Sequence, residues 1–163
     1  MVVMSARGRL TVQVVLTAVV VTGLVVDAFV HFHLASAFPH NTTSTLSEAD
    51  LFHLEAIAAV IAAAALLVRP RRYTAAFAFL VAAAGTAAVV VYRYVDVGAI
   101  GPIPNMYDPY WAPPEKTLSA VAEGVAAVAA LALLVMFHLR TRTAAAPAAK
   151  DRVLLGPVGS ERA

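Results

Sequence analysis

The chain has 163 residues, of which 61% are hydrophobic and 13% charged, whereas an average soluble domain is roughly 45–50% apolar. Its formal net charge of +2 is too small and too scattered to indicate nucleic-acid binding. Because the chain has no cysteine, disulfides, thiolate metal sites, iron–sulfur clusters and thiol nucleophiles are excluded. The composition predicts an integral membrane protein.

Four apolar stretches follow a short N-terminal segment, residues 1–9. They cover about residues 10–37, 48–68, 73–96 and 117–139. Each approaches or exceeds the roughly 20 residues that a helix needs to cross a bilayer. We therefore expect an all-α four-helix bundle that spans the cell membrane over residues 10–140. Residues 141–163 have no apolar period and should form a flexible tail.

Helix-boundary signals agree with these limits. Ser47 and Asp50 have the spacing of a capping box, in which a hydroxyl is followed three residues later by a carboxylate. Pro70 separates the second and third stretches, because proline does not continue a helix. After Pro114, Thr117 is the expected N-terminal cap of the fourth helix.

Arginine and lysine gather at one set of segment ends. They precede the first stretch, join the second to the third and follow the fourth, whereas the loop 38–47 has none and the loop 97–116 has only Lys116. This asymmetry predicts cytoplasmic termini and two outer loops. Ala35-Ser36-Ala37 also has the form of a signal-peptide cleavage site. The apolar run before it exceeds the usual length of about 7–15 residues, so an uncleaved helix is preferred.

Ionisable side chains interrupt every apolar stretch near its predicted outer end. A charge at mid-membrane costs at least about 2.5–3.5 kcal/mol on insertion scales, so such residues usually face the bundle interior, pair or bind a ligand. They are Asp27, His31 and His33 in the first stretch, His53 and Glu55 in the second, Arg93 in the third and Glu123 in the fourth. Their shared depth predicts a polar site near one membrane surface.

Helical spacing indicates which of these residues share a helix face. Asp27 and His31 are four apart and share one helix face, so the carboxylate can orient or charge the imidazole. Ser119 and Glu123 have the same spacing on the fourth helix. The site that we expect joins Asp27, His31, His53, Glu55 and Glu123, with Ser119 as a supporting residue.

Two further histidines have a weaker claim. His33 points away from the face of His31, and His53 and Glu55 splay by about 160° around their helix axis. For each of these histidines, an interfacial position is as well supported as a place in the site. Glu55 is the deeper residue and harder to explain as solvated.

Arg93 is the only deep cation, and Tyr92 beside it and Asp96 three residues later are expected to support the site or balance its charge. Arg93 either snorkels to the interface or forks onto one of the three carboxylates. With three ionised carboxylates and one guanidinium, the site would carry a net charge of about −2 in low dielectric, which proteins avoid by protonation or by binding a cation. The shortage of positive charge favours a bound metal, a protonated histidine or a shared proton.

The predicted outer loop 97–116 contains five prolines and several aromatic residues. Tyr107 and Trp111 suit the headgroup level of a membrane. The loop is either an ordered lid, to which Asp108 also belongs, or a simple interfacial anchor. Met106 is the one thioether near the histidines, and imidazole with thioether is a donor set suited to copper.

Several of these patterns occur together in a known group. They are Asp27-x-x-x-His31-x-His33, His53-x-Glu55, Tyr92-Arg93-Tyr94-Val95-Asp96 and Pro104-Asn105-Met106-Tyr107-Asp108-Pro109. Over about residues 10–140 the chain resembles small four-helix membrane proteins of actinobacteria whose activity is unassigned. The resemblance implies the same architecture and no particular chemistry.

No motif of a known catalyst is present, so the sequence specifies no reaction. We expect a metal ion, copper in preference to zinc, at an extracytoplasmic His/carboxylate site. One alternative is a b-type haem or a quinone, with His31 or His33 and His53 as axial ligands of the haem. Another is a non-catalytic subunit of a larger membrane complex or a homo-oligomer. Transport is less favoured, because the inner halves of the helices are almost wholly apolar.

Overall fold

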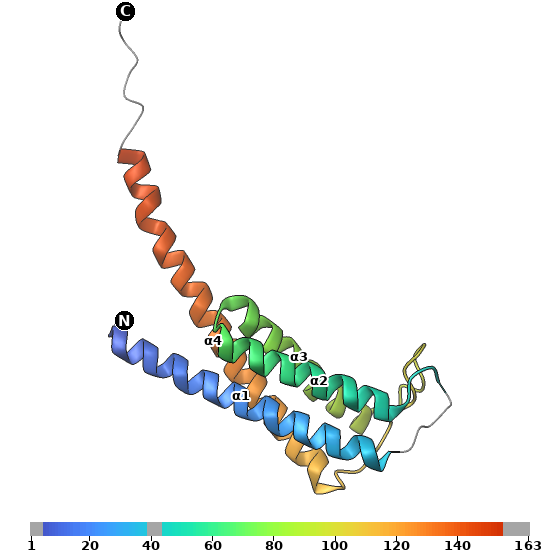
Figure 1. Ribbon diagram of the computed structural model, residues 1–163. Helices are drawn as coiled ribbons and strands as arrows, with labels where there is room; N and C mark the ends of the chain where they lie inside the picture. The colour runs from blue at the N-terminus through green and yellow to red at the C-terminus, as the bar shows by residue number, and fades with distance from the viewer. Residues whose placement is uncertain (1–4, 39–43, 155–163) are drawn as a thin grey trace, which may run out of the picture.

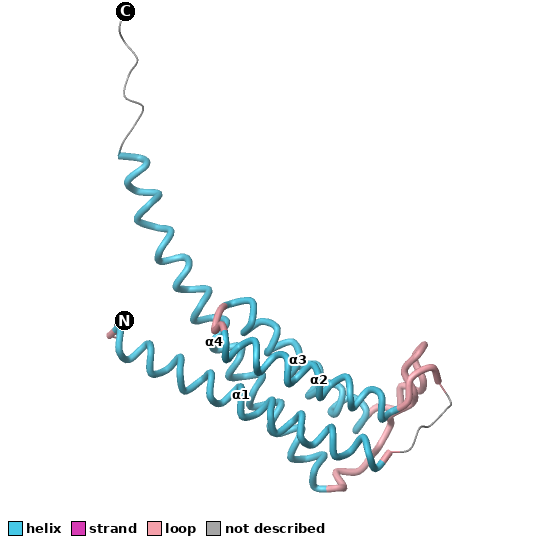
Figure 2. Tube along the Cα trace, in the orientation of Figure 1, coloured by secondary structure: helices cyan, strands magenta, loops and turns pink. Residues whose placement is uncertain are grey.

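The computed structural model describes residues 5–38 and 44–154, and within them it contains helices and loops but no strand (Figures 1 and 2). The helices are α1 (Ala6–Ala37), α2 (Glu48–Val68), α3 (Arg72–Tyr94) and α4 (Pro114–Leu154). The predicted all-α fold is confirmed.

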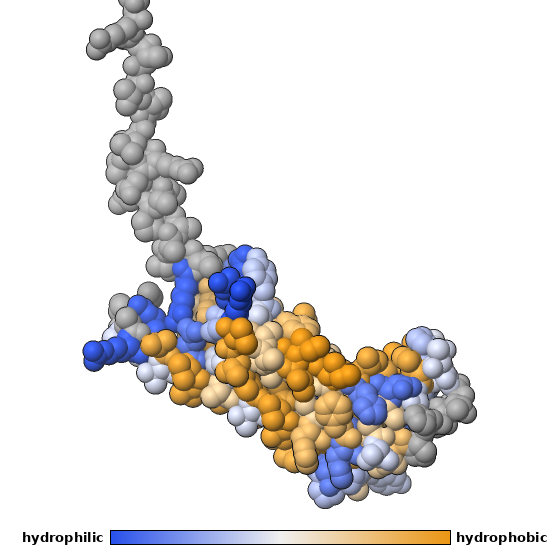
Figure 3. All heavy atoms as spheres, viewed as in Figure 1, coloured by the Kyte–Doolittle hydropathy of each residue, from blue (hydrophilic) through white to orange (hydrophobic). Residues whose placement is uncertain are grey.

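Each helix carries a stretch that is long and apolar enough to cross a bilayer. The stretches are Arg7–Ala37, Glu48–Val68, Arg72–Tyr94 and Pro114–Arg140. Figure 3 shows the apolar band on the visible face, with hydrophilic residues gathered at both ends of the bundle. Helices suit hydrocarbon because they satisfy their backbone hydrogen-bonding groups internally. The chain is thus a helical membrane protein.

Capping chemistry explains where α1 and α2 begin. The Ser5 hydroxyl accepts a hydrogen bond from the Gly8 N–H (3.2 Å). At α2, Ser47 Oγ accepts from the Asp50 N–H (3.1 Å), while Asp50 Oδ2 accepts from the Ser47 N–H (2.9 Å). This reciprocal pair is the predicted capping box.

The start of α4 differs from its prediction. The helix begins at Pro114, because proline is favoured in the first turn, where its missing N–H would have had no partner. The Thr117 hydroxyl donates instead to the Trp111 carbonyl (3.3 Å). The prediction that Thr117 caps the helix is therefore wrong.

The end of α4 also lies further along the chain than its apolar stretch. The sequence predicted an end near residue 139, but the helix continues to Leu154 and leaves the bundle (Figure 1). Alanine, the strongest helix former, is abundant in this part. The rest of the predicted tail, residues 155–163, lies outside the described residues, as do residues 1–4 and 39–43.

Each helix packs against two others, α1 against α2 and α4, and α3 against α4 and, over a shorter stretch, α2. The contacting faces are rich in alanine, which lets helix backbones approach closely. Gly23 lies where α1 meets α4, because a Cβ there would be 2.7 Å from the Ala122 carbonyl oxygen. Buried alanines on the four helices include Ala28, Ala56, Ala59, Ala62, Ala75, Ala78, Ala82, Ala126 and Ala130.

The start of α1 and the turn between α2 and α3 lie at the end of the bundle from which α4 leaves (Figure 1). The connections from α1 to α2 and from α3 to α4 lie at the opposite end. This arrangement places the arginine-rich segments together. That their end is cytoplasmic stays a prediction from the arginines.

The contact at Gly23 gives a test of the packing. Gly23→Ala should destabilise the bundle by about 1–3 kcal/mol, because the new methyl group meets backbone that cannot move aside. Gly124→Ala is the matched control, since a Cβ at that position has no heavy atom within 4 Å. Equilibrium unfolding in detergent, followed by circular dichroism, measures both. Equal stability of the two variants would contradict the close approach of α1 and α4.

Candidate metal centre

A cluster of buried polar side chains lies between α1 and α4. Asp27 and His31 come from α1, Ser119 and Glu123 from α4, and each pair is one helical turn apart. Asp27 and Glu123 are completely buried, and His31 and Ser119 are 7% and 2% exposed. The packing of α1 on α4 thus brings together two pairs that the sequence had each placed on a single helix face.

The four side chains form a chain of short contacts. His31 Nδ1 lies 2.7 Å from Asp27 Oδ1, and Ser119 Oγ lies 2.8 Å from the same oxygen and 2.9 Å from Glu123 Oε1. The serine hydroxyl has one proton and donates fully to only one of the two carboxylates. The other contact is favourable when Glu123 or Asp27 carries a proton, or when a cation lies between them.

Each carboxylate also has one oxygen without a partner among the described residues. These atoms, Asp27 Oδ2 and Glu123 Oε2, are buried and accept no hydrogen bond. One ligand atom from each of Asp27, His31 and Glu123 lies within 4.8 Å of the other two. The three residues therefore offer one nitrogen and two oxygen donors that could hold a metal ion.

Gly85 of α3 completes this centre, and sequence reasoning missed it. A Cβ at this position would lie 2.7 Å from Glu123 Oε2, so any larger residue would displace the carboxylate. The available signal was a glycine in the interior of an alanine-rich helix, which usually has a packing or functional reason.

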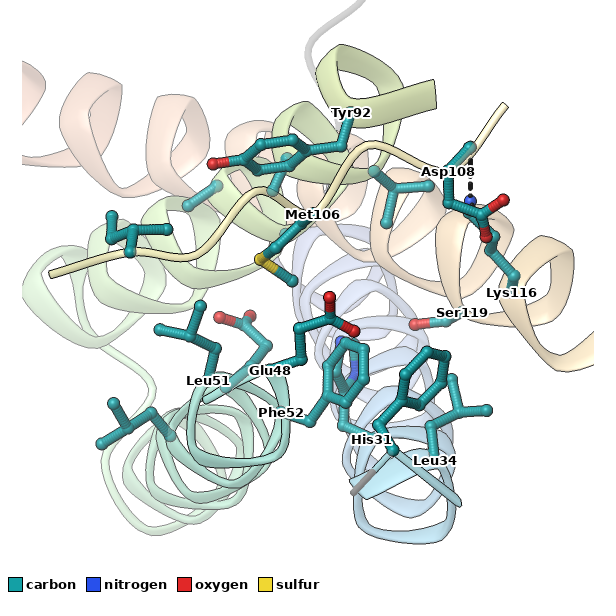
Figure 4. A pocket seen from close by; sticks show the side chains of 18 of the residues that line it. His31, Leu34, Glu48, Leu51, Phe52, Tyr92, Met106, Asp108, Lys116 and Ser119 are labelled. Atoms are coloured by element: carbon teal, nitrogen blue, oxygen red, sulfur yellow. Dashed lines mark hydrogen bonds and ion pairs between the residues drawn. The ribbon is translucent and has the colours of Figure 1, made fainter. Parts of the chain in front are cut away.

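A pocket of about 670 Å³ lies beside the centre, under the loop between α3 and α4. Figure 4 shows His31 and Ser119 facing it from α1 and α4, Glu48 from α2 and Met106 from the loop. Neither the pocket nor the place of Glu48 in it was predicted. Both depend on gaps between helices, which the sequence does not show.

Glu55 lines this pocket but is not among the three clustered ligands. Its Oε1 is buried and has no hydrogen-bond partner among the described residues, and its charge interacts with His31 and Asp27. Glu55 therefore adds negative potential to the pocket wall from a position next to the centre.

The other two histidines lie on the outside of the bundle. His33 and His53 are both exposed. His33 stacks on Phe29, and His53 contacts the edge of Phe32, with ring centroids 6.4 and 6.0 Å apart. The structure thus does not bring them to His31.

Arg93 turns away from the carboxylates. Its guanidinium lies over the rings of Tyr94 (5.0 Å) and Trp111 (5.7 Å), and in the described part of the chain it forms no ion pair. The sequence allowed Arg93 to be the internal counter-charge, but the structure does not place it there. Without Arg93, the centre has less positive charge to balance its carboxylates than it would have with Arg93 as a counter-charge.

Hydrogen bonds fix the loop that covers the pocket. The Lys116 ammonium donates to Asp108 Oδ2 (2.9 Å) and to the Asp108 carbonyl (3.0 Å), and the Asp108 N–H donates to the Tyr92 carbonyl (3.1 Å). Asp96 accepts from the Asn105 side chain (3.0 Å). Tyr92, Met106 and Asp108 thereby line the pocket, whereas Tyr107 and Trp111 are exposed and are not among its lining residues.

No protein-family model matches the chain, and comparisons with curated proteins and with solved structures likewise give no match. The resemblance to actinobacterial membrane proteins therefore stays a prediction, and the site has to be argued from its own geometry.

A single substitution tests how much the Ser119 hydroxyl contributes to the stability of the bundle. Ser119→Ala should lower the free energy of unfolding by about 1–3 kcal/mol, because Asp27 and Glu123 lose the group that bridges them in a buried site. Ser36→Ala is the control, since Ser36 is exposed and bonds only within its own turn of α1. Unfolding in detergent gives the comparison. A Ser119→Ala protein as stable as wild type would show that the bridge contributes nothing.

The loop should loosen in acid. Partial burial opposes ionisation of Asp108, but hydrogen bonds from Lys116 and the Tyr110 N–H outweigh it and lower its pKa. A lowered pKa means that the stabilisation is present at neutral pH and is lost as pH falls through that lowered value, below the usual aspartate range. Fluorescence of Trp111, the single tryptophan, reports the change. Asp108→Asn should lack the transition, and an unchanged acid transition in that variant would refute its assignment to Asp108.

Proposed function

We propose that this membrane protein binds one divalent metal ion between α1 and α4 through Asp27, His31 and Glu123. The observation that supports it is the pair of completely buried carboxylates, each with an unpartnered oxygen, beside one imidazole. Burying such charge without compensation is costly, and a metal ion supplies the compensation. Ser119 contacts both carboxylates and is therefore placed to fix their positions when they act as metal ligands.

Zinc fits this donor set better than copper. Copper was favoured by several imidazoles together with Met106, but His33 and His53 lie exposed and Met106 lies outside the ligand group. One imidazole and two carboxylates are donors that zinc accepts, with water or a hydroxyl as a fourth ligand. We therefore propose zinc first, and copper second.

The other interpretations have less support. A haem with two histidine ligands requires His33 or His53 near His31, and both lie on the bundle surface. A structural role in a larger complex stays a prediction. Apolar residues are exposed on all four helices, but they suit contact with lipid as well as contact with another subunit. If the arginine-rich end is cytoplasmic, the metal centre lies in the extracytoplasmic half.

Metal analysis tests the proposal. Protein purified from cells supplied with zinc and copper should carry about one zinc ion per chain, measured by elemental analysis. Glu123→Gln and His31→Gln should each reduce zinc affinity, measured by titration calorimetry, by at least about tenfold, because each removes a ligand of a small site.

His33→Gln and His53→Gln are the matched controls, since they remove exposed imidazoles and should leave zinc affinity unchanged. Copper in place of zinc would overturn the choice of metal. Protein without stoichiometric metal would overturn the proposed function, as would equal losses in the control variants.

A further inference from the structure

The pocket beside the metal centre has the size and walls of a ligand site. Its volume of about 670 Å³ falls within the roughly 300–1,000 Å³ typical of small-molecule pockets. Leu34, Phe38, Leu51, Phe52 and Val89 form much of its apolar wall. Two polar side chains that are more than nine-tenths buried, His31 and Ser119, also face it. An apolar body with a polar end fits such a pocket.

Part of the pocket wall is exposed on the side of the bundle. Leu54 of α2, which lines it, is 55% exposed, and Ala84 and Ala88 of α3 are lining residues that are also exposed. All three belong to apolar stretches long enough to cross a bilayer. This part of the pocket wall, on α2 and α3, therefore faces the hydrocarbon of the membrane. A ligand that dissolves in lipid can enter there.

The charges in the pocket favour a cation. Its lining lysine, Lys116, is already bound to the Asp108 carboxylate, and His31 is paired with Asp27. Glu48 and Glu55 also line the pocket, and neither forms an ion pair among the described residues. Two carboxylates thus face the pocket without a positive partner.

We propose that this pocket binds an amphipathic organic cation, an alkylamine that enters from the lipid between α2 and α3. Its ammonium group binds beside Glu55, where it donates hydrogen bonds to the carboxylate oxygens, and Glu48, about two turns away on α2, adds negative potential to the pocket wall. Its hydrocarbon chain lies against Leu34, Phe52 and Val89. This site is distinct from the metal centre, because neither glutamate belongs to the three clustered metal ligands.

Electrostatics excludes the common membrane anions. A fatty-acid carboxylate or a lipid phosphate would face Glu48 and Glu55, and the pocket wall has no free cation to bind it. Like charges placed together in this way oppose binding. A neutral alcohol fills the same apolar space and donates one hydrogen bond, but it leaves the charge unbalanced. An amine meets all three requirements of the pocket: size, apolarity and charge.

Three probes with the same chain length and different head groups test this. The protein is placed in nanodiscs of zwitterionic lipid at pH 7, where an alkylamine is protonated. Radiolabelled dodecylamine should bind saturably above the background of empty nanodiscs. Unlabelled dodecanol should compete at least about tenfold more weakly than dodecylamine, and dodecanoate should not compete.

Variants then locate the site. Glu55→Gln should reduce dodecylamine affinity at least about tenfold with little effect on dodecanol, because it removes the charge and keeps the shape. Ala88→Phe should block binding of both by filling space in the pocket that Ala88 lines. Ala87→Phe is its control, since Ala87 is exposed on the same helix but does not line the pocket. Glu123→Gln should lose zinc and retain dodecylamine, which separates this proposal from the metal centre.

Three results would overturn the proposal. The first is no saturable dodecylamine binding by the wild-type protein. The second is equal competition by all three head groups, which would make the pocket a nonspecific apolar space. The third is unchanged amine affinity in Glu55→Gln, which would place the bound amine elsewhere.

Discussion

The contact between α1 and α4 through Asp27, Ser119 and Glu123 is the interaction on which the rest of the structure depends. Lipid provides no hydrophobic driving force between helices, so close packing and hydrogen bonds hold them together. Alanine faces pack in more than one register, because they present few distinguishing shapes. The polar contacts accept only one register, since each buried carboxylate must meet its partner. Gly23 and Gly85 remove the side chains that would prevent that approach.

The same contact would link the proposed metal binding to assembly of the bundle. Two carboxylates and one imidazole meet there, while Arg93 lies over aromatic rings elsewhere. A cation between α1 and α4 would therefore stabilise the packed bundle in proportion to its affinity for that state. Toward the arginine-rich end the buried core of the described helices is apolar, which suits a site that holds an ion more than a path that conducts one.

The two proposed sites differ because of the way α3 packs. It packs closely against α4, but it contacts α2 only over a shorter stretch. Gly85 of α3 seats the Glu123 carboxylate, which is completely buried between helices. One turn nearer the loop, Ala88 of α3 lines the pocket together with Leu54 and Glu55 of α2. The bond between Lys116 and Asp108 holds the loop over the pocket and neutralises the lysine of the pocket wall.

The sequence by itself determined the four apolar helices, the capping box at Ser47 and the shared faces of Asp27 with His31 and of Ser119 with Glu123. These features are local, because hydropathy and helical spacing depend only on nearby residues. Only the tertiary structure decided which polar groups meet. His31 faces inward while His33 and His53 lie outside, Gly85 supports Glu123, and Glu48 and Glu55 face an open pocket. These outcomes depend on the rotation of each helix about its axis and on its neighbours, and the alanine and valine found on every side of these helices do not fix that rotation.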